Sequence, residues 1–346
     1  MDRGVVLTEP GRVALEEIEL DAPGPNEVQV RVAASGVCRS DLHVIEQDGW
    51  GHRLPVLLGH EGAGVVEQVG EGVEGLEPGD RVVLGWRAPC GVCGPCRRGD
   101  PRRCARPASA ARRLHLRDGR KLTHTLRMGT FATRTIVHSA AAVRIRDELP
   151  LDQACLIGCA VATGVCSVLE TAQVWPGARV AVIGCGAVGI SAIQGARIAG
   201  AAEIHAIDPD ARKLEAARAF GATHAGEPEE VDFAFDVVGR PETLELAIHL
   251  LGHAGTAVLV GLPKPDVAAR IELAPFFDMR SRVLVSHGGD HLPAADFPRL
   301  ARWALEGKLD LEGMVSKRIS LADVDAAFED MARGDVIRSV IEIDEE

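Results

Sequence analysis

The sequence predicts an α/β protein with two domains, a β-rich, barrel-like domain and a parallel, doubly wound sheet. The chain has 346 residues, which is too long for one ordinary core. Roughly the first 150 residues show short strand patterns separated by turn signals, typical of a β-rich barrel. From about residue 177, short apolar strands alternate with helical patterns, as in a parallel sheet covered by helices.

The expected strands of the first domain lie next to turn residues. Residues 28–32 alternate between apolar and polar, 64–69 follow a glycine-rich turn, and 81–84 follow Gly79-Asp80. A cysteine-rich loop, 90–104, interrupts this pattern. These features predict short strands with one large insertion.

The expected elements of the second domain come in strand–helix pairs. The predicted strands are 179–183, 203–207, 233–238 and 256–260, and the predicted helices are 188–199, 211–220 and 241–251. After about residue 287 the pattern predicts helices at 297–306 and 321–332 and a closing strand at 336–343.

Composition narrows the class of protein. Apolar residues make up 46% and charged residues 25% of the chain, as in an average globular protein. No apolar run approaches a membrane span, and no signal sequence opens the chain, so we expect a cytoplasmic protein without a membrane partner. The net charge of −12 argues against a nucleic-acid partner. Nine cysteines then suggest metal or redox chemistry rather than a disulfide framework.

A glycine-rich turn follows the predicted strand 179–183. Residues 184–189 read GCGAVG, which is the G-x-G-x-x-G motif, with glycines at Gly184, Gly186 and Gly189. The glycines allow a tight turn and close approach of the backbone to a pyrophosphate, which the N-terminus of the following helix then faces. The motif predicts a dinucleotide-binding, Rossmann domain.

An acidic residue ends the next predicted strand. Asp208 lies 24 residues beyond Gly184, where its carboxylate would accept hydrogen bonds from both ribose hydroxyls and repel a 2′-phosphate. The cofactor expected is therefore NAD rather than NADP, with Lys213 within reach of the same ribose. The alternative is that Asp208 is only the N-cap of the following helix.

Four cysteines lie close together in the interrupting loop. Cys90, Cys93, Cys96 and Cys104 have the spacing C-x2-C-x2-C-x7-C, which closes a tetrahedron of thiolates with little loop entropy. This spacing predicts a structural zinc. A redox C-x-x-C would need only two of the four, and a zinc-ribbon nucleic-acid binder is disfavoured by the acidic chain and the single cluster.

Basic residues crowd the segment 97–121. One interpretation is a phosphate-binding surface. The other, which we prefer, is a solvated face that offsets the negative charge of four zinc-bound thiolates. The residues are Arg97, Arg98, Arg102, Arg103, Arg106, Arg112, Arg113, Arg117, Arg120 and Lys121.

A second set of potential metal ligands is dispersed along the chain. Cys38, His60, Glu61 and Cys159 are far apart in sequence, and no periodicity brings them together. From spacing alone, each is more often a core or surface residue than a ligand.

Three segments around these residues resemble the zinc-containing medium-chain alcohol dehydrogenase family. They are GVCRSD at 36–41, GHE at 59–61 followed by Gly64 and Gly70, and IGC at 157–159 followed by Thr163-Gly164. The resemblance covers essentially the whole chain. It implies a GroES-like β-barrel catalytic domain formed by 1–160 and 287–346, and a Rossmann NAD-binding domain formed by 161–286.

The resemblance also implies a catalytic zinc. Cys38, His60 and Cys159 would bind the metal and leave a fourth position for substrate, with Glu61 as an occasional ligand behind it. Asp41 would orient His60 by accepting its other ring N–H. The chain would then hold two zincs, one structural and one catalytic. The catalytic zinc would act as a Lewis acid on an alcohol whose hydride passes to NAD.

Further roles follow from the same resemblance. Ser40 and His43 match a proton relay from the alcohol to solvent, the alternative for His43 being a surface histidine. Arg39 and Arg338 match two arginines that bind the pyrophosphate, the alternative for Arg338 being a solvated charge at a strand edge. Thr163 and Val188 would press against the nicotinamide.

The resemblance further implies a mostly apolar substrate pocket, which suits a primary aliphatic or aromatic alcohol. Its positions fall on Trp50, Trp86, Met128 and Leu262, with His287 at the far wall. Glutathione-dependent formaldehyde dehydrogenases carry acidic residues where this chain has Gly49 and Gly51, and polyol dehydrogenases usually lack the third cysteine, so we disfavour both substrate classes. A non-catalytic scaffold is disfavoured because all ligands are retained. The expected assembly is a homodimer or homotetramer.

Overall fold

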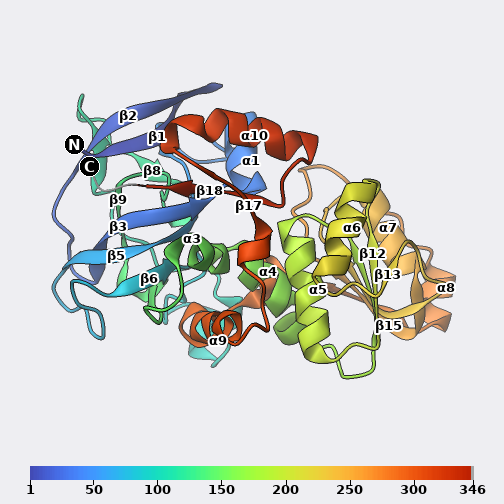
Figure 1. Ribbon diagram of the computed structural model, residues 1–346. Coiled ribbons are helices and arrows are strands. Elements are labelled where there is room, and N and C mark those ends of the chain that lie inside the picture. The colour runs from blue at the N-terminus through green and yellow to red at the C-terminus, as the bar shows by residue number, and fades with distance from the viewer. Residues whose placement is uncertain (344–346) are drawn as a thin grey trace. The chain divides into compact units, whose positions relative to one another are not determined.

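The computed structural model describes residues 1–343, and the chain divides into two compact units (Figure 1). Unit 1 consists of Met1–Cys159 and Leu292–Glu346, and unit 2 consists of Ala160–His291. The first boundary, after Cys159, falls one residue before the one expected from the sequence, and the second, after His291, falls five residues after the expected one.

Two sheets form unit 1. The first has the order β7-β2-β1-β4-β8. It contains β1 (Arg3–Glu9), β2 (Arg12–Leu20), β4 (Val56–Leu57), β7 (Leu114–Leu116) and β8 (Thr123–His124). The second has the order β10-β6-β5-β3-β18-β17, with β9 also paired to β3. It contains β3 (Glu27–Gly36), β5 (Glu61–Val69), β6 (Arg81–Leu84), β9 (Arg134–His138), β10 (Ala142–Arg144), β17 (Val315–Ile319) and β18 (Arg338–Glu342).

Strand β3 organises the second sheet. The alternating residues Val28, Val30 and Val32 are fully buried, which confirms the strand predicted at 28–32. Strand β18 pairs antiparallel with the last residues of β3, Ile341 opposite Ser35. The end of the chain therefore completes a sheet begun near its start, and the predicted closing strand is shortened to β18.

Helices and helical turns connect these strands. The α-helices of unit 1 are α1 (Arg39–Glu46), α2 (Gly94–Arg97), α3 (Leu151–Ala154), α9 (Pro293–Leu305) and α10 (Val324–Arg333). The helical turns are η1 (Pro101–Arg103), η2 (Thr125–Arg127), η3 (Ser139–Ala141), η4 (Cys155–Gly158), η7 (Glu312–Met314) and η8 (Leu321–Asp323). The helix predicted at 321–332 is thus η8 followed by α10.

Unit 2 is a parallel sheet with the order β13-β12-β11-β14-β15-β16. Its strands are β11 (Arg179–Ile183), β12 (Glu203–Ile207), β13 (His224–Ala225), β14 (Val231–Asp236), β15 (Leu251–Leu259) and β16 (Arg282–Val285). The strand order reverses direction at β11, which is the order of the dinucleotide-binding fold, and such folds bind ligands at the carboxyl ends of the strands beside this point.

Helices cover the sheet of unit 2. They are α4 (Ala160–Cys166), α5 (Ala187–Ala199), α6 (Ala211–Ala219), α7 (Pro241–His249) and α8 (Leu273–Asp278), with a π-helical turn η5 (Ser167–Ala172) and a helical turn η6 (His287–Asp290). Helices α5 and α6 pack against β12, and α7 packs against β14 and β15 (Figure 1). The alternation of strands and helices predicted from residue 177 is confirmed.

Within residues 1–343, no single helix is long and apolar enough to cross a membrane. One bent pair, Leu151–Gly158 with Ala160–Ala172, meets the length and composition requirements together. All seven residues of α4, which belongs to this pair, are buried in the protein.

Candidate active site

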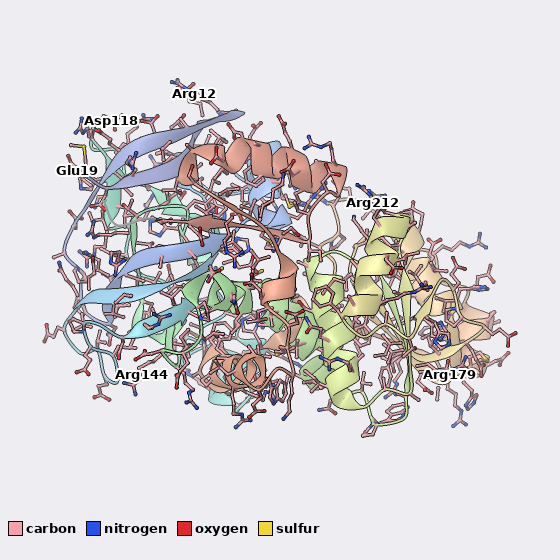
Figure 2. The ribbon with its side chains drawn as sticks, viewed as in Figure 1. Arg12, Glu19, Asp118, Arg144, Arg179 and Arg212 are labelled. Atoms are coloured by element: carbon pink, nitrogen blue, oxygen red, sulfur yellow. The ribbon has the colours of Figure 1, made fainter. Side chains whose placement is uncertain are left out.

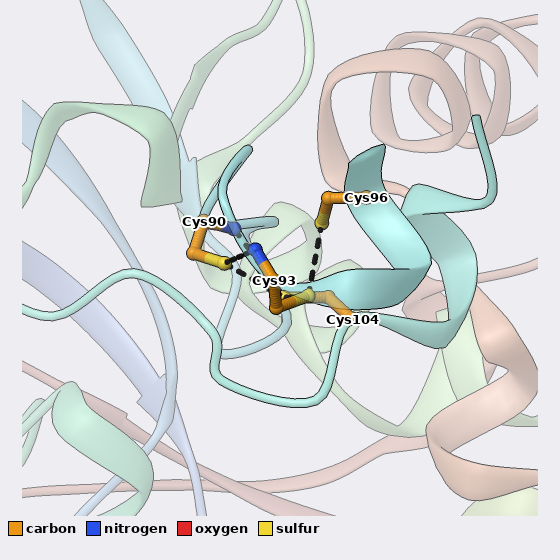
Figure 3. A group of neighbouring side chains, drawn as sticks. All are labelled: Cys90, Cys93, Cys96 and Cys104. Carbon is orange, nitrogen blue, oxygen red and sulfur yellow. Dashed lines mark hydrogen bonds between the residues drawn. The ribbon is translucent and has the colours of Figure 1, made fainter. Parts of the chain in front are cut away.

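The four clustered cysteines converge on one point of unit 1. The Sγ atom of Cys93 lies 3.4 Å from that of Cys96 and 3.8 Å from that of Cys104, and Cys104 lies 3.7 Å from Cys90 (Figure 3). Sulfurs on a zinc tetrahedron with bonds of about 2.3 Å are about 3.8 Å apart. The four thiols therefore fit a structural zinc.

Backbone N–H groups donate hydrogen bonds to some of these sulfurs. The N–H of Cys90 donates to Cys104 Sγ, and the N–H of Cys93 donates to Cys90 Sγ, both at 3.3 Å. Backbone N–H groups of Cys96 and Ala105 lower the pKa of Cys93 to about 6. Burial and the neighbouring thiols of Cys93 and Cys104 instead raise the pKa of Cys96 to about 12. Metal ligation needs thiolates, so the loop by itself favours the ligating form at Cys93 and not at Cys96.

The basic segment that follows the cysteines contacts carboxylates. Arg102 pairs with Asp296 at 2.6 Å, and Arg113 pairs with Glu27 at 2.8 Å. Further pairs join Arg103 to Asp100, Arg117 to Glu17 and Arg120 to Asp118; Asp118 lies with Glu19 and Arg12 at one end of unit 1 in Figure 2. Five of the ten basic residues of the segment are thus paired with carboxylates. Arg127, outside the segment, also interacts electrostatically with Cys104, and the expected role of the segment as the counter-charge of the thiolates stays a prediction.

The dispersed residues Cys38, His60 and Cys159 meet inside unit 1. One ligand atom from each lies within 4.8 Å of the other two, and exposed fractions are 6%, 0% and 7%. Cys38 follows β3, His60 precedes β5, and Cys159 follows η4. Strand pairing between β3 and β5, with Gly36 opposite Glu61, brings the first two together.

His60 presents one ring nitrogen to this point. Its Nδ1 lies 3.2 Å from Asp41 Oδ1, and Asp41 also accepts the N–H of Gly59 at 2.9 Å. Within residues 1–343 the buried Nε2 has no hydrogen-bond partner. A buried, unpaired imidazole nitrogen next to two thiols is the donor set of a catalytic zinc with two cysteines and one histidine, so the residues present fit the metal.

Electrostatics in this cluster favour ionisation of Cys38 but not of Cys159, because the hydrogen bond with Cys38, burial and the negative charges of Cys38 and Glu61 raise the pKa of Cys159 well above its usual value. Cys159, which shares a hydrogen bond with Cys38, and the positive charges of Arg338 and His60 hold the pKa of Cys38 well below its usual value, although burial opposes this. Burial also opposes the charged form of His60, yet Asp41 and Cys38 raise its pKa well above the usual value. The cluster thus carries a thiolate before any metal is considered.

Glu61 and Arg338 lie behind the three ligands. Arg338 Nε lies 3.3 Å from Glu61 Oε2, and its Nη1 donates to the Val37 carbonyl at 2.6 Å. Only 5% of Arg338 is exposed, so the interpretation of Arg338 as a solvated charge at a strand edge is wrong. Sequence patterns gave no signal for this pairing, because it depends on the long-range contact of β18 with β3.

The other predicted residues of this region lie on α1. Ser40 Oγ is 3.9 Å from Cys38 Sγ, and His43 lies three residues further along the helix, on the same face. The ring of His43 is half-buried and 6.3 Å from that of Trp50. Arg39, the first residue of α1, is exposed.

The glycine-rich turn of unit 2 has the predicted conformation. Gly184 has a φ of +96°, Gly186 is the N-cap of α5, and a Cβ on Gly189 would lie 1.9 Å from the Gly184 carbonyl oxygen. Only glycine fits at the first and third positions. Val188 is half-buried in the first turn of α5, and Thr163 is 8% exposed in α4.

Asp208 lies beside this turn. Its Oδ2 accepts the N–H of Cys185 at 2.9 Å, which places the carboxylate against the loop. The N-cap of α6 is Asp210, whose side chain accepts the N–H of Arg212, so the interpretation of Asp208 as the N-cap is wrong. Lys213 is close enough to act electrostatically on Cys185.

The predicted pocket residues are divided between the units. In unit 1, Trp86 and Met128 belong to one buried apolar cluster, whereas Trp50 packs against another. Leu262 and His287 belong to unit 2 and are exposed.

Two cysteine-based metal sets on a β-rich unit and a dinucleotide-binding turn on a parallel sheet define a zinc-dependent dehydrogenase. The Alcohol dehydrogenase GroES-like domain matches residues 24–147, and the Zinc-binding dehydrogenase domain matches 187–306. The chain belongs to the zinc-containing medium-chain alcohol dehydrogenase family and is an NAD-dependent oxidoreductase.

Relatives within this family differ in substrate. The chain is 33% identical to an S-(hydroxymethyl)glutathione dehydrogenase of Escherichia coli O1:K1 / APEC, covering 98% of this chain and 99% of the relative. It is 30% identical to alcohol dehydrogenase 1 of Pisum sativum, with coverages of 99% and 97%. The crystal structure of benzyl alcohol dehydrogenase from Acinetobacter calcoaceticus matches with a TM-score of 0.92 and 28% identity, over 99% and 100% of the two chains.

Replacing one buried ligand separates the two metal sites. We expect elemental analysis to find about two zincs per chain in the native protein and about one in Cys159→Ser, whose turnover is abolished. Cys166→Ser, which changes a buried cysteine outside both sets, should retain both zincs. Two zincs in Cys159→Ser would show that Cys159 is not a ligand.

Removing the carboxylate beside the glycine turn tests the cofactor site. Asp208→Gly should weaken NAD binding and reduce the bias against NADP, because both the ribose acceptor and the repelling charge are lost. Asp210→Gly, which removes the neighbouring N-cap instead, should leave the ratio of kcat/KM for the two cofactors unchanged. A native preference for NADP would contradict the assignment.

Proposed function

We propose that this chain oxidises a primary alcohol, aliphatic or aromatic, reversibly to an aldehyde with transfer of a hydride to NAD. The observation that carries the proposal is the buried set Cys38, His60 and Cys159, whose ligand atoms lie within 4.8 Å of one another, with the Nε2 of His60 left without a hydrogen-bond partner among residues 1–343. When bound there, zinc supplies a Lewis acid that lowers the pKa of the substrate hydroxyl.

Residues of α1 then handle the proton. Ser40, whose hydroxyl lies near Cys38, accepts the proton of the substrate hydroxyl and passes it outward. His43, half-buried on the same helix face, delivers it to solvent. Asp41 fixes the tautomer of His60 by accepting its Nδ1–H, so that Nε2 keeps its lone pair. Glu61 and Arg338 form an ion pair behind the thiols, so that their opposite charges compensate each other.

Candidate cofactor-binding residues occur in each unit. In unit 2, the glycine turn and the N-terminus of α5 bind the pyrophosphate, Asp208 and Lys213 bind the adenosine ribose, and Thr163 and Val188 contact the nicotinamide. In unit 1, the exposed Arg39 of α1 is a proposed donor to the pyrophosphate. Arg338 adds a donor from the part of its guanidinium that Val37 and Glu61 do not use, since that group has five N–H donors.

The substrate class follows from the proposed pocket. Trp50, Trp86, Met128 and Leu262, the positions that the family resemblance assigns to the pocket, are all large and apolar, which favours an aliphatic or aromatic group. Gly49 and Gly51 offer no carboxylate to the amine of a glutathione adduct. The alternatives are that adduct, favoured by the 33% identical relative that acts on it, and a secondary alcohol or polyol.

A substrate panel tests the proposal. With NAD in excess, we expect kcat/KM for benzyl alcohol and a medium-chain primary alcohol to exceed that for sorbitol, 2-propanol and S-(hydroxymethyl)glutathione, read from the absorbance of reduced cofactor. A preference for the glutathione adduct would replace the proposed substrate, and no turnover of any alcohol would contradict the class of reaction.

Two substitutions on α1 test the proton relay. Ser40→Ala should lower kcat by about 10³-fold, because that hydroxyl is next to the reacting group. This value lies within the range of about 10²–10⁴-fold that is typical of general acid–base catalysis. His43→Gln should lower kcat by about tenfold or less, because water can bypass an outer relay group, and imidazole buffers should partly restore it. Equal impairment of the two variants, or no effect of His43→Gln, would remove the histidine from the relay.

We also propose a homo-oligomer in the cytoplasm. Strand β16 is at the edge of the unit 2 sheet, and Leu273, Phe277 and Val285 around it are 77%, 81% and 66% exposed. An apolar sheet edge of this kind favours self-association about a two-fold axis. All nine cysteines are free thiols, as expected in a reducing compartment. Light scattering distinguishes a dimer from a tetramer.

A further inference from the structure

Three metal-binding side chains converge at an edge of the sheet in unit 2, far in sequence from either cysteine set. Glu203 and His205 lie on β12, two residues apart and therefore on one face of the strand. His224 lies on the edge strand β13, directly opposite His205 in the parallel ladder. One ligand atom from each residue lies within 4.8 Å of the other two.

The local geometry leaves donor atoms available. His205 Nε2 is 3.1 Å from Glu203 Oε2, and the rings of His205 and His224 stack with centroids 4.5 Å apart and planes 11° apart. His224 Nδ1 lies 2.8 Å from the hydroxyl of Thr223, which leaves its Nε2 for another partner. His224 is exposed and His205 is 8% exposed, so an ion can enter from solvent.

We propose that Glu203, His205 and His224 form a third metal site, which binds a divalent transition ion such as Zn²⁺, Ni²⁺ or Cu²⁺. Two imidazoles and one carboxylate suit these ions better than Mg²⁺ or Ca²⁺, which prefer oxygen ligands. Three protein ligands leave the remaining positions for water. The site is independent of the proposed alcohol oxidation and of both family zinc sites.

Binding requires a small rearrangement of the exposed ligand. An ion must lie near the plane of each imidazole, and two nearly parallel rings cannot both meet this condition. Ligand atoms on a tetrahedral zinc with bonds of about 2.0–2.1 Å are about 3.3–3.4 Å apart, which is closer than the 4.8 Å limit of the present arrangement. His224 is exposed on the edge strand β13, so its side chain has room to turn out of the stack toward such an ion.

An arginine competes for the carboxylate. Arg179 Nε lies 3.1 Å from Glu203 Oε2, and its Nη1 lies 3.9 Å from Glu230. Arg179 is the first residue of β11. In Figure 2 it lies at the opposite end of unit 2 from Arg212, a residue of α6. When an ion binds, Arg179 can turn to Glu230. Removing Arg179 should therefore strengthen metal binding, whereas a purely structural cluster would lose stability without gaining affinity.

Zinc uptake tests the proposal in the full-length enzyme with its two zinc sites loaded. We expect equilibrium dialysis against micromolar Zn²⁺, followed by elemental analysis, to raise the content from about two to about three zincs per chain. His224→Ala should stay at about two at the same free zinc concentration, with affinity for the third ion reduced at least about tenfold. Arg179→Gln should reach three at a lower zinc concentration than the native protein.

Two further variants separate metal binding at this cluster from other effects of substitution. His253→Ala removes an exposed histidine of β15 outside the cluster and should take up the third zinc like the native protein. Glu203→Gln keeps the shape of the side chain and should weaken uptake without unfolding, which circular dichroism checks. Uptake of a third zinc by His224→Ala with native affinity, or no uptake by the native protein, would overturn the proposal.

Discussion

Buried charge in unit 1 is the constraint on which the candidate active site depends. Asp41, His60, Glu61 and Arg338 are at most 5% exposed, and two thiols lie among them. Ionised groups are costly to bury unless each has a partner, and removing one partner of a buried pair costs about 3–5 kcal/mol. Glu61 is paired with Arg338 and Asp41 is hydrogen-bonded to His60, and a bound metal ion would balance the remaining negative charge of the thiolates.

The strand order of one sheet satisfies this constraint. Strand β3 lies between β5 and β18, so that Gly36 at its end faces both Glu61 and Val340. A Cβ at Gly36 would lie 2.3 Å from Glu61 Oε2, so glycine here admits the carboxylate. The chain then places Cys38 two residues after β3 and Arg338 at the start of β18. The C-terminal strand therefore packs beside the candidate metal site, although Arg338 lies 301 residues from Val37, whose carbonyl it contacts.

Sequence reasoning succeeded where the chemistry is local. The four clustered cysteines lie within one loop, and the glycine turn lies between a strand and a helix that periodicity predicts, so spacing alone indicated both sites. It failed for Cys38, His60 and Cys159, because only the pairing of β3 with β5 and β18 brings them together, and resemblance to a family had to supply the set. The same limit hid the pairing of Arg338 with Glu61. The two candidate N-caps, Asp208 and Asp210, lie two residues apart, a difference smaller than the precision of predicted helix ends.

The chemistry and the choice of substrate depend on different kinds of backbone. The proposed metal ligands lie next to strands and in buried turns. Trp50 instead lies in a turn where four successive residues, Asp48 to Gly51, have positive φ values of 47°, 102°, 46° and 78°. Left-handed conformations at Asp48 and Trp50 cost free energy, so the turn persists because its surroundings hold it, including the contact of Trp50 with His43. Loops vary more readily than strands, and relatives in this family are named for different substrates, among them benzyl alcohol and S-(hydroxymethyl)glutathione. Under the proposed pocket, the substrate preference of this chain should therefore be changed more easily at this turn than at the proposed ligands Cys38, His60 and Cys159.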